Sequence, residues 1–185
     1  MTNTGGLPSY IVNVINQERQ PQQATLAPAS EEDMIIWQCH WPNIWRQSDW
    51  DCEAIIKLQY QTITQGLMRM ALYPYGLANP EDDFQYIEIR NIESNPNKLI
   101  IPVGQWLIWY ACKIALNNCF GNRQGYYLLL DSLLQAAAYY RQKVKMDFID
   151  ITTISPTEEG YVFGFKKEKA IRFCRELETR YQFPR

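Results

Sequence analysis

The sequence predicts an α+β protein in which a mostly antiparallel sheet packs with three to four helices. Runs that alternate or are rich in β-branched residues, bounded by turn residues, occur along the chain between longer stretches of helical apolar spacing. The 185 residues are 46% hydrophobic and 21% charged, which is typical of a globular chain. The net charge of −2 gives no global attraction to nucleic acid or acidic lipid.

Residues 1–33 are rich in Asn, Gln, Thr and Pro and predict a flexible polar N-terminal tail. The apolar run from Tyr10 to Ile15 is an exception that could form a strand or a docking segment. Residues 34–185 are expected to form a single globular α+β domain, because this length supports one sizeable core.

The first expected elements of that domain are a strand and a helix. Residues 34–41 predict a strand that ends before Pro42. Ser48, with Asp51 three residues later, is typical of a helix start, and the apolar residues from Ile56 to Ala71 follow helical spacing. A strand over residues 58–62 remains an alternative.

The remaining elements follow in order. Residues 84–90 and 99–103 predict a hairpin, and helices are expected over about 104–119 and 126–140. Strands over 146–151 and 161–165 and an amphipathic helix at the C-terminus complete the set. This order favours a ferredoxin-like split β-α-β core with an extra C-terminal strand and helix.

The densest aromatic cluster of the chain contains Trp37, Trp41, Trp45 and Trp50, with the single histidine, His40, among them. Tryptophan combines a large apolar ring with one N–H donor and is enriched at interface anchors. Trp41, Trp45 and Trp50 lie near a connection and are therefore candidate partner-binding residues. The alternative is that these rings belong to the core.

Complete catalytic constellations are not recognisable in the sequence. His40 has no identifiable nucleophile and orienting group, and the cysteines and histidine lack zinc-finger spacing. Phosphate-loop and nucleophile-elbow motifs are also absent from it. We therefore expect a non-enzymatic accessory, assembly or regulatory protein, without a cofactor, that associates with a protein partner or with its own copies.

A nucleic-acid-binding module is the first alternative, because basic and aromatic residues interleave near the C-terminus. The residues that would contact nucleic acid are Arg141, Lys143, Lys145, Tyr161, Phe163, Lys166 and Lys167.

A metal-dependent nuclease or hydrolase is the second alternative. Asp82, Asp83 and Glu88 could hold Mg²⁺, and their layout resembles the core motif of metal-dependent nucleases. Arg90 stands where that motif has lysine, and the carboxylates lie unusually close in sequence. A polar strand face on which Glu88 pairs with Arg90 explains the same pattern.

The five cysteines are odd in number and irregularly spaced, and the N-terminus shows no apolar signal segment. These features favour a reduced, cytoplasmic protein. No apolar run is long enough to predict a membrane span.

Overall fold

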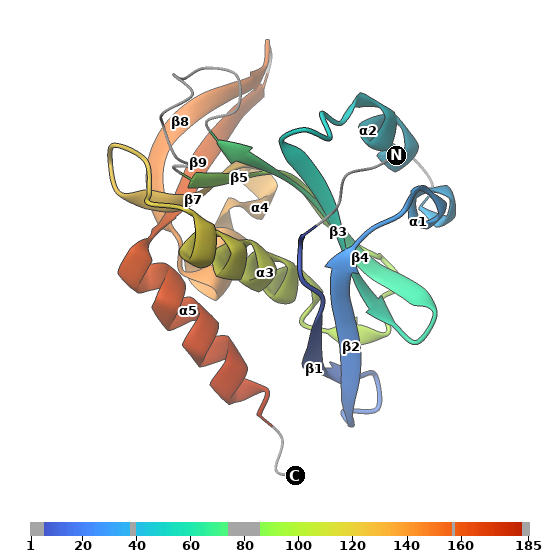
Figure 1. Ribbon diagram of the computed structural model, residues 1–185. Helices are drawn as coiled ribbons and strands as arrows, with labels where there is room; N and C mark the ends of the chain where they lie inside the picture. Colours follow the sequence, from blue (N-terminus) through green and yellow to red (C-terminus); the bar gives the residue numbers. More distant parts are fainter. Residues whose placement is uncertain (1–5, 38–39, 74–85, 157, 183–185) are drawn as a thin grey trace. The chain divides into compact units, whose positions relative to one another are not determined.

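The computed structural model describes residues 6–37, 40–73, 86–156 and 158–182. Its strands follow the hydrogen-bonded order β6-β1-β2-β3-β4-β5-β7-β9-β8 (Figure 1). The chain divides into two compact units, and β5 (Tyr86–Ser94) and helix α3 (Val103–Asn118) contribute residues to both. Unit 1 comprises residues 1–71, 91–108 and 181–185, and unit 2 comprises residues 72–90 and 109–180.

Unit 1 is built on antiparallel strands. Its elements are β1 (Tyr10–Asn16), β2 (Pro21–Pro28), α1 (Glu31–Ile36), α2 (Trp41–Gln47), β3 (Glu53–Tyr60), most of β4 (Ile63–Tyr73) and β6 (Ile100–Ile101). Strand β1 pairs with both β2 and β6, and β2 pairs with β3. The segment expected to be a polar tail therefore supplies two strands, whose inward-facing residues Val12, Val14, Ala24 and Leu26 are buried.

Unit 2 continues the element order. It contains β7 (Tyr126–Leu133), α4 (Leu134–Ala138), the π-helix η1 (Tyr139–Val144), β8 (Asp147–Ser155), β9 (Glu158–Lys166) and α5 (Lys167–Arg180). Strand β9 pairs antiparallel with β7 on one side and β8 on the other. The predictions of strands near 146–151 and 161–165, of a helix over 104–119 and of the C-terminal amphipathic helix are confirmed.

The predicted strand over residues 34–41 is wrong, because two short helices occupy this region. Helix α1 begins with a capping box in which Ser30 and Asp33 satisfy each other's backbone N–H groups. Pro42 lies in the first turn of α2, where its missing N–H needs no intrahelical acceptor. A proline taken as a strand end is therefore a helix start.

The predicted helix from Ser48 to Ala71 is also wrong, because β3 and β4 form a hairpin there. The turn contains Gln61, a non-glycine residue with a φ of 56°. Strand β3 is buried over both of its faces along most of its length. A strand covered on both faces loses polar alternation, so its apolar residues also fitted helical spacing.

Two further predictions are corrected. Strand β6 pairs with β1, so residues 84–90 and 99–103 do not form the expected hairpin. Residues 126–133, expected to begin a helix, form β7, whose side chains at Leu128, Leu130 and Ser132 alternate inward.

The sheet and helices do not form the expected ferredoxin-like core. The described chain has nine strands in one sheet, and two strands, β1 and β2, precede its first helix, whereas a split β-α-β core begins with one strand followed by a helix. None of the helices in the described part of the chain has the length and apolar character needed to cross a membrane.

Candidate functional site

The parallel pairing of β5 with β7 in unit 2 is short. It joins Ile87–Ile89 to Leu128–Leu130, whereas the other strand registers that we observe are antiparallel. Strand β7 continues to Leu133, still paired with β9. In the described residues, no strand pairs with β7 beyond Leu130 on the side that β5 occupies. The main chain of residues 131–133 thus has an edge that can accept an extended ligand.

Titratable side chains lie on β7 and in the segment that follows it along the chain. Desolvation raises the pKa of Asp131, on β7. Desolvation, with a smaller effect of the neighbouring Tyr140, raises the pKa of Tyr139 well above its ordinary value. The two rings meet edge to face with centroids 5.3 Å apart. Both phenols therefore remain protonated at neutral pH and can act as hydrogen-bond or proton donors.

The backbone that carries these tyrosines is unusual. Residues 139–144 form a π-helix, a conformation that is rare and frequent at functional sites. It ends at Lys145, whose φ of 64° is left-handed. Tyr140 is buried and stacks near Phe163, whereas 36% of Tyr139 is exposed. Of the two tyrosines, Tyr139 is therefore the more exposed.

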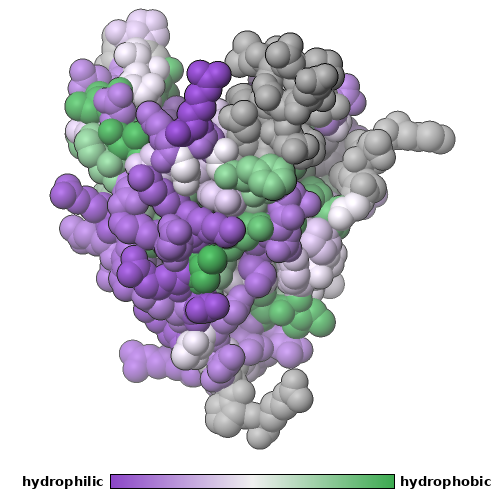
Figure 2. Space-filling view, turned by 60° about the vertical axis from the view of Figure 1, so that its left-hand side comes forward, coloured by the Kyte–Doolittle hydropathy of each residue, from purple (hydrophilic) through white to green (hydrophobic). Residues whose placement is uncertain are grey.

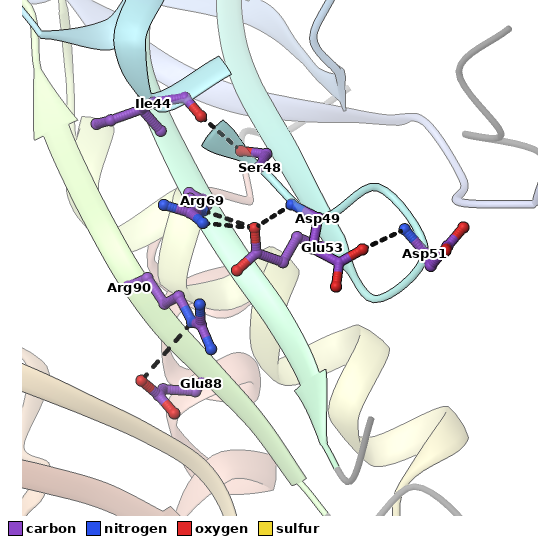
Figure 3. Close-up of polar contacts among 8 residues, drawn as sticks. All are labelled: Ile44, Ser48, Asp49, Asp51, Glu53, Arg69, Glu88 and Arg90. Carbon is purple, nitrogen blue, oxygen red and sulfur yellow. Dashed lines mark hydrogen bonds and ion pairs between the residues drawn. The ribbon is translucent and has the colours of Figure 1, made fainter. Parts of the chain in front are cut away.

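Glu88 and Arg90 lie on β5 in unit 2. Arg90 Nε is 4.0 Å from Glu88 Oε1 (Figure 3), and both side chains are about one-third exposed. This is the pairing on a polar strand face that the sequence offered as the alternative to a metal site. Asp82 and Asp83 lie outside the described residues, and the described chain contains no cluster of three or more His, Cys, Asp or Glu residues that could hold a metal ion.

Two buried carboxylates in unit 1 are paired with cations. Glu53 Oε2 accepts hydrogen bonds from Arg69 and from the backbone N–H of Asp49 (Figure 3). Lys57 donates to both oxygens of Asp33 at 2.9 Å. Desolvation would raise the pKa of Asp33, but the hydrogen bonds from Lys57 and Ser30 outweigh it and lower that pKa. These pairs join strands to one another and to α1.

A third carboxylate of unit 1, Glu93, has different surroundings. Trp41 Nε1–H donates to Glu93 Oε2 at 2.8 Å, and His40 Nε2 lies 3.5 Å from the same oxygen. The Glu93 side chain is 39% exposed and that of His40 is 56% exposed, whereas Trp41 is fully buried. The His40 ring stacks on Trp41 with centroids 5.9 Å apart.

The tryptophans form an aromatic cluster in unit 1. Trp37, Trp41 and Trp45 are buried together with residues of β3 and β4, and Trp50 is partly buried against them. Trp45 and Trp50 have ring centroids 4.3 Å apart. This burial is what the core alternative expects, and contact of Trp41, Trp45 or Trp50 with a partner stays a prediction.

The basic and aromatic residues of the nucleic-acid alternative all lie in unit 2. Arg141, Lys143 and Lys145 are exposed on and after η1, and Lys166 and Lys167 are exposed at the β9–α5 junction. Phe163 is buried, so its ring cannot stack on a base, and Tyr161 is half-buried against Phe148. Hydrophilic side chains cover most of the face shown in Figure 2, where apolar patches are small.

Sequence reasoning missed Glu93, Asp131 and Tyr139 as functional candidates. Glu93 meets Trp41 across 52 positions of sequence, and such a contact leaves no local pattern. Tyr139 lies at the end of a stretch that was predicted to be a helix. No local sequence pattern there distinguishes a π-helix from an α-helix. The sole histidine was the one usable signal.

No protein-family model matches the chain, and no curated protein matches it. Solved structures do match. Mycobacterium smegmatis RimJ, in complex with CoA-disulfide, is 8% identical with a TM-score of 0.56, over 94% of this chain and 97% of that chain. Arabidopsis thaliana Naa50, with the bisubstrate analogue CoA-Ac-MVNAL, is 11% identical with a TM-score of 0.56, over 77% and 98%.

A GNAT family acetyltransferase from Elizabethkingia anophelis with acetyl-CoA bound is 16% identical with a TM-score of 0.54, over 77% of this chain and 97% of that chain. The chain therefore has the GNAT fold, and this fold replaces the predicted ferredoxin-like one.

These neighbours overturn the expected function. A non-enzymatic accessory, assembly or regulatory protein, with its nucleic-acid-binding and nuclease alternatives, is wrong because the fold neighbours are acetyltransferases. The prediction rested on missing nucleophiles, metal ligands and phosphate loops. Transfer of an acyl group that is already activated as a thioester needs none of them, so their absence did not exclude an enzyme.

Proposed function

We propose that this chain is an acyltransferase that moves an acetyl group from acetyl-CoA to an amine. The observation that carries the proposal is the GNAT fold, shared with acetyltransferases over nearly the whole of those chains. The short parallel pairing of β5 and β7 supports it, because the edge of residues 131–133 offers main-chain groups to an extended, amide-containing molecule such as the pantetheine arm of CoA. The main-chain groups of residues 131–133 in unit 2 thus fit the pantetheine arm of CoA.

Acetyl-CoA, when bound, would supply a thioester whose carbonyl carbon is activated for attack by an amine. In the transfer a C–N bond forms and the C–S bond breaks, the amine loses a proton, and the departing thiolate gains one. Tyr139 Oη–H would donate this second proton. The Tyr139 hydroxyl is protonated at neutral pH, although the desolvation that raises its pKa makes it a weaker acid than an exposed phenol.

Binding and turnover can be measured separately. We expect acetyl-CoA to raise the melting temperature of the chain, because a ligand that binds only the folded state stabilises it. Release of free CoA, followed by chromatography with a panel of primary amines, reports transfer. Chromatography is preferable to a thiol reagent, because Cys112, Cys119 and Cys174 are thiols of the protein itself.

Substitution of the proton donor tests the assignment within unit 2. Tyr139→Phe keeps the ring and removes the hydroxyl, so kcat should fall about 100-fold or more with the KM for acetyl-CoA little changed. Tyr127→Phe, on β7, is the matched control and should leave kcat unaltered. No thermal shift and no CoA release with any amine would overturn the proposed function. An unchanged kcat in Tyr139→Phe would remove only the donor assignment.

We also propose that the chain works in the cytoplasm. Cys112 and Cys174, which contact each other in unit 2 as thiols and not as a disulfide, support a reducing compartment.

A further inference from the structure

An exposed phenylalanine begins the loop between α3 and β7 in unit 2 (yellow in Figure 1). Phe120 is 72% exposed, whereas Cys119, which precedes it, is buried at the end of α3. A single exposed apolar side chain is common on protein surfaces, so the surroundings of this ring decide whether it has a role.

The loop that carries Phe120 is tied to itself and to β7. Asn122 Oδ1 accepts the backbone N–H of Tyr126 at 2.9 Å, and the backbone N–H of Asn122 donates to the Tyr126 carbonyl at 2.8 Å. Gly121, with a φ of 88°, lies so close to Tyr127 that a Cβ would meet this ring at 2.9 Å. The Phe120 ring is thus presented on a preorganised backbone, which lowers the entropy that binding would cost.

Two tyrosines and two lysines lie beside this loop. Tyr126, the first residue of β7, pairs in register with Lys166, the last residue of β9. Lys166 Nζ is 5.3 Å from the centroid of the Tyr126 ring, and Lys167 Nζ is 5.9 Å from that of Tyr127. A cation–π contact holds an ammonium beside an aromatic ring and leaves its charge in place.

The charges of these lysines, and of Arg123 in the loop itself, are available to a ligand. Arg123, Lys166 and Lys167 are exposed, and none of them forms an ion pair with a carboxylate in the part of unit 2 that the structure describes. Glu168 is the carboxylate next to them in sequence, so three cations stand against one anion. This surface is therefore positive, although the whole chain has a net charge of −2.

We propose that this surface docks the protein on an anionic lipid bilayer. The basic aromatic patch consists of Phe120, Arg123, Tyr126, Tyr127, Lys166 and Lys167. The Phe120 ring enters the boundary between headgroups and acyl chains, the two tyrosines lie at the level of the headgroups, and the basic side chains contact anionic lipids. A single apolar anchor binds membranes only marginally, so the ring and the cations act together.

A bilayer suits the basic aromatic patch better than an acidic protein does. A specific protein interface buries about 800 Å² on each partner, and its centre is depleted of charged residues. Here one ring stands among polar and charged side chains, because residues 121–125 are half-buried or exposed. A headgroup layer is itself polar and anionic, and it accepts a protruding ring without a matching pocket. Anionic lipids of the cytoplasmic leaflet also fit the proposed compartment.

Sedimentation with vesicles tests the docking. We expect the chain to sediment with vesicles of phosphatidylcholine that contain about one-third phosphatidylserine, and to stay in the supernatant with phosphatidylcholine alone. Added salt should weaken the binding, because exposed charges are screened over about 8 Å at physiological ionic strength. No sedimentation with the anionic vesicles, or equal sedimentation with both, would overturn the proposal.

Removal of the ring tests the apolar contribution. Phe120→Ala should keep the melting temperature, because the side chain is exposed, and should weaken binding to the anionic vesicles about 10-fold. Phe148→Ala is the matched control, since it removes another partly exposed ring, on β8, and should leave the affinity unaltered. Undiminished binding in Phe120→Ala, or an equal loss in Phe148→Ala, would refute the assignment to this patch.

Exchange of the lysines tests the electrostatic contribution. Lys166→Gln combined with Lys167→Gln should weaken binding about 25-fold, whereas arginine at both positions should preserve it, because each basic residue near an anionic surface is worth about a fivefold change in affinity. Glu168→Gln should strengthen binding about fivefold, since it removes the neighbouring negative charge. Equal binding of the glutamine and arginine variants would contradict the proposal.

A tryptophan at position 120 reports where the ring goes. With anionic vesicles, emission of Phe120→Trp should shift to shorter wavelength and be quenched by lipids with brominated acyl chains, beyond any change in the six native tryptophans. Poly-glutamate serves as a soluble anion without an apolar phase. If it binds as tightly as the vesicles and Phe120→Ala affects neither, the patch is a site for acidic proteins and the membrane proposal is wrong. These measurements contain no acetyl-CoA, so their outcome is independent of the proposed function.

Discussion

Individual residues of unit 1 show how differently carboxylates can be used by one fold. Glu53 is almost fully buried, and its Oε2 lies 2.6 Å from Arg69 Nη2 (Figure 3). This ion pair joins β3 to β4. The Glu93 side chain is partly exposed, accepts a hydrogen bond from Trp41 and has His40 Nε2 3.5 Å away. The first arrangement contributes to stability, because a buried charge needs a partner of opposite charge, whereas the second leaves the carboxylate partly exposed to solvent.

The Glu53–Arg69 pair predicts a large stability effect. Arg69→Met should lower the free energy of unfolding by about 3–5 kcal/mol, because it leaves the buried Glu53 carboxylate without the guanidinium. Urea unfolding measures this, and the double variant with Glu53→Gln should recover much of the loss. Arg46→Met is the control, since exposed Arg46 hydrogen-bonds only within α2. A loss below about 1 kcal/mol in Arg69→Met would contradict the prediction.

At the scale of elements, Gly66 shows why β4 can pack against the first turns of α3 in unit 1. A Cβ at this position would lie 2.4 Å from Val103 Cγ1, 3.0 Å from Leu107 Cδ1 and 3.1 Å from the Glu93 carbonyl oxygen. In the hairpin, the same glycine permits a close approach of strand and helix.

Gly66→Ala is therefore expected to destabilise the chain by about 1–3 kcal/mol, as overpacking does in well-filled cores. Thermal or urea unfolding measures the loss. Val103→Ala removes the nearest methyl group, so the double variant should lose less than the sum of the two single changes. Strict additivity in this cycle would show that the Val103 contact is not the cause.

Prediction of the elements from sequence succeeded for α5, which has one polar face, and failed for β3, which has none. Helix α5 was recognisable because Ala170, Cys174 and Leu177 are buried on one stripe with charges opposite. Strand β3 was not, because it is buried on both faces. Helix α3 was expected as a buried helix, because its residues are apolar nearly all round.

For the molecule as a whole, buried phenols and thiols set the response to alkali. Burial raises the pKa of Tyr140 from 10.0 to about 12 and that of Cys119 from 9.0 to about 11. The unfolded chain ionises these groups at lower pH than the folded chain does. Their contribution to stability is therefore complete below the ordinary values and is lost as pH rises through the folded ones.

We accordingly expect the free energy of unfolding to fall between about pH 9 and pH 12, with Tyr140 accounting for up to about 3 kcal/mol across its two pH units. Urea unfolding at pH 8, 10 and 11 measures the slope. Tyr140→Phe should flatten it above pH 10, because phenylalanine does not ionise. A slope that Tyr140→Phe leaves unchanged would contradict the assignment.

The sequence by itself determined the α+β class, the helices α3 and α5, the strands near residues 147 and 163, and the presence of an aromatic cluster around one histidine. These features depend on composition and on periodicity within one element, which neighbouring residues carry. Only the tertiary structure decided that residues 10–28 join the sheet, that β3 and β4 are strands, that β5 and β7 run parallel, and that Glu93 meets His40 and Trp41. Strand pairing and site assembly join residues distant in sequence, and such contacts form only when the folded chain brings them together.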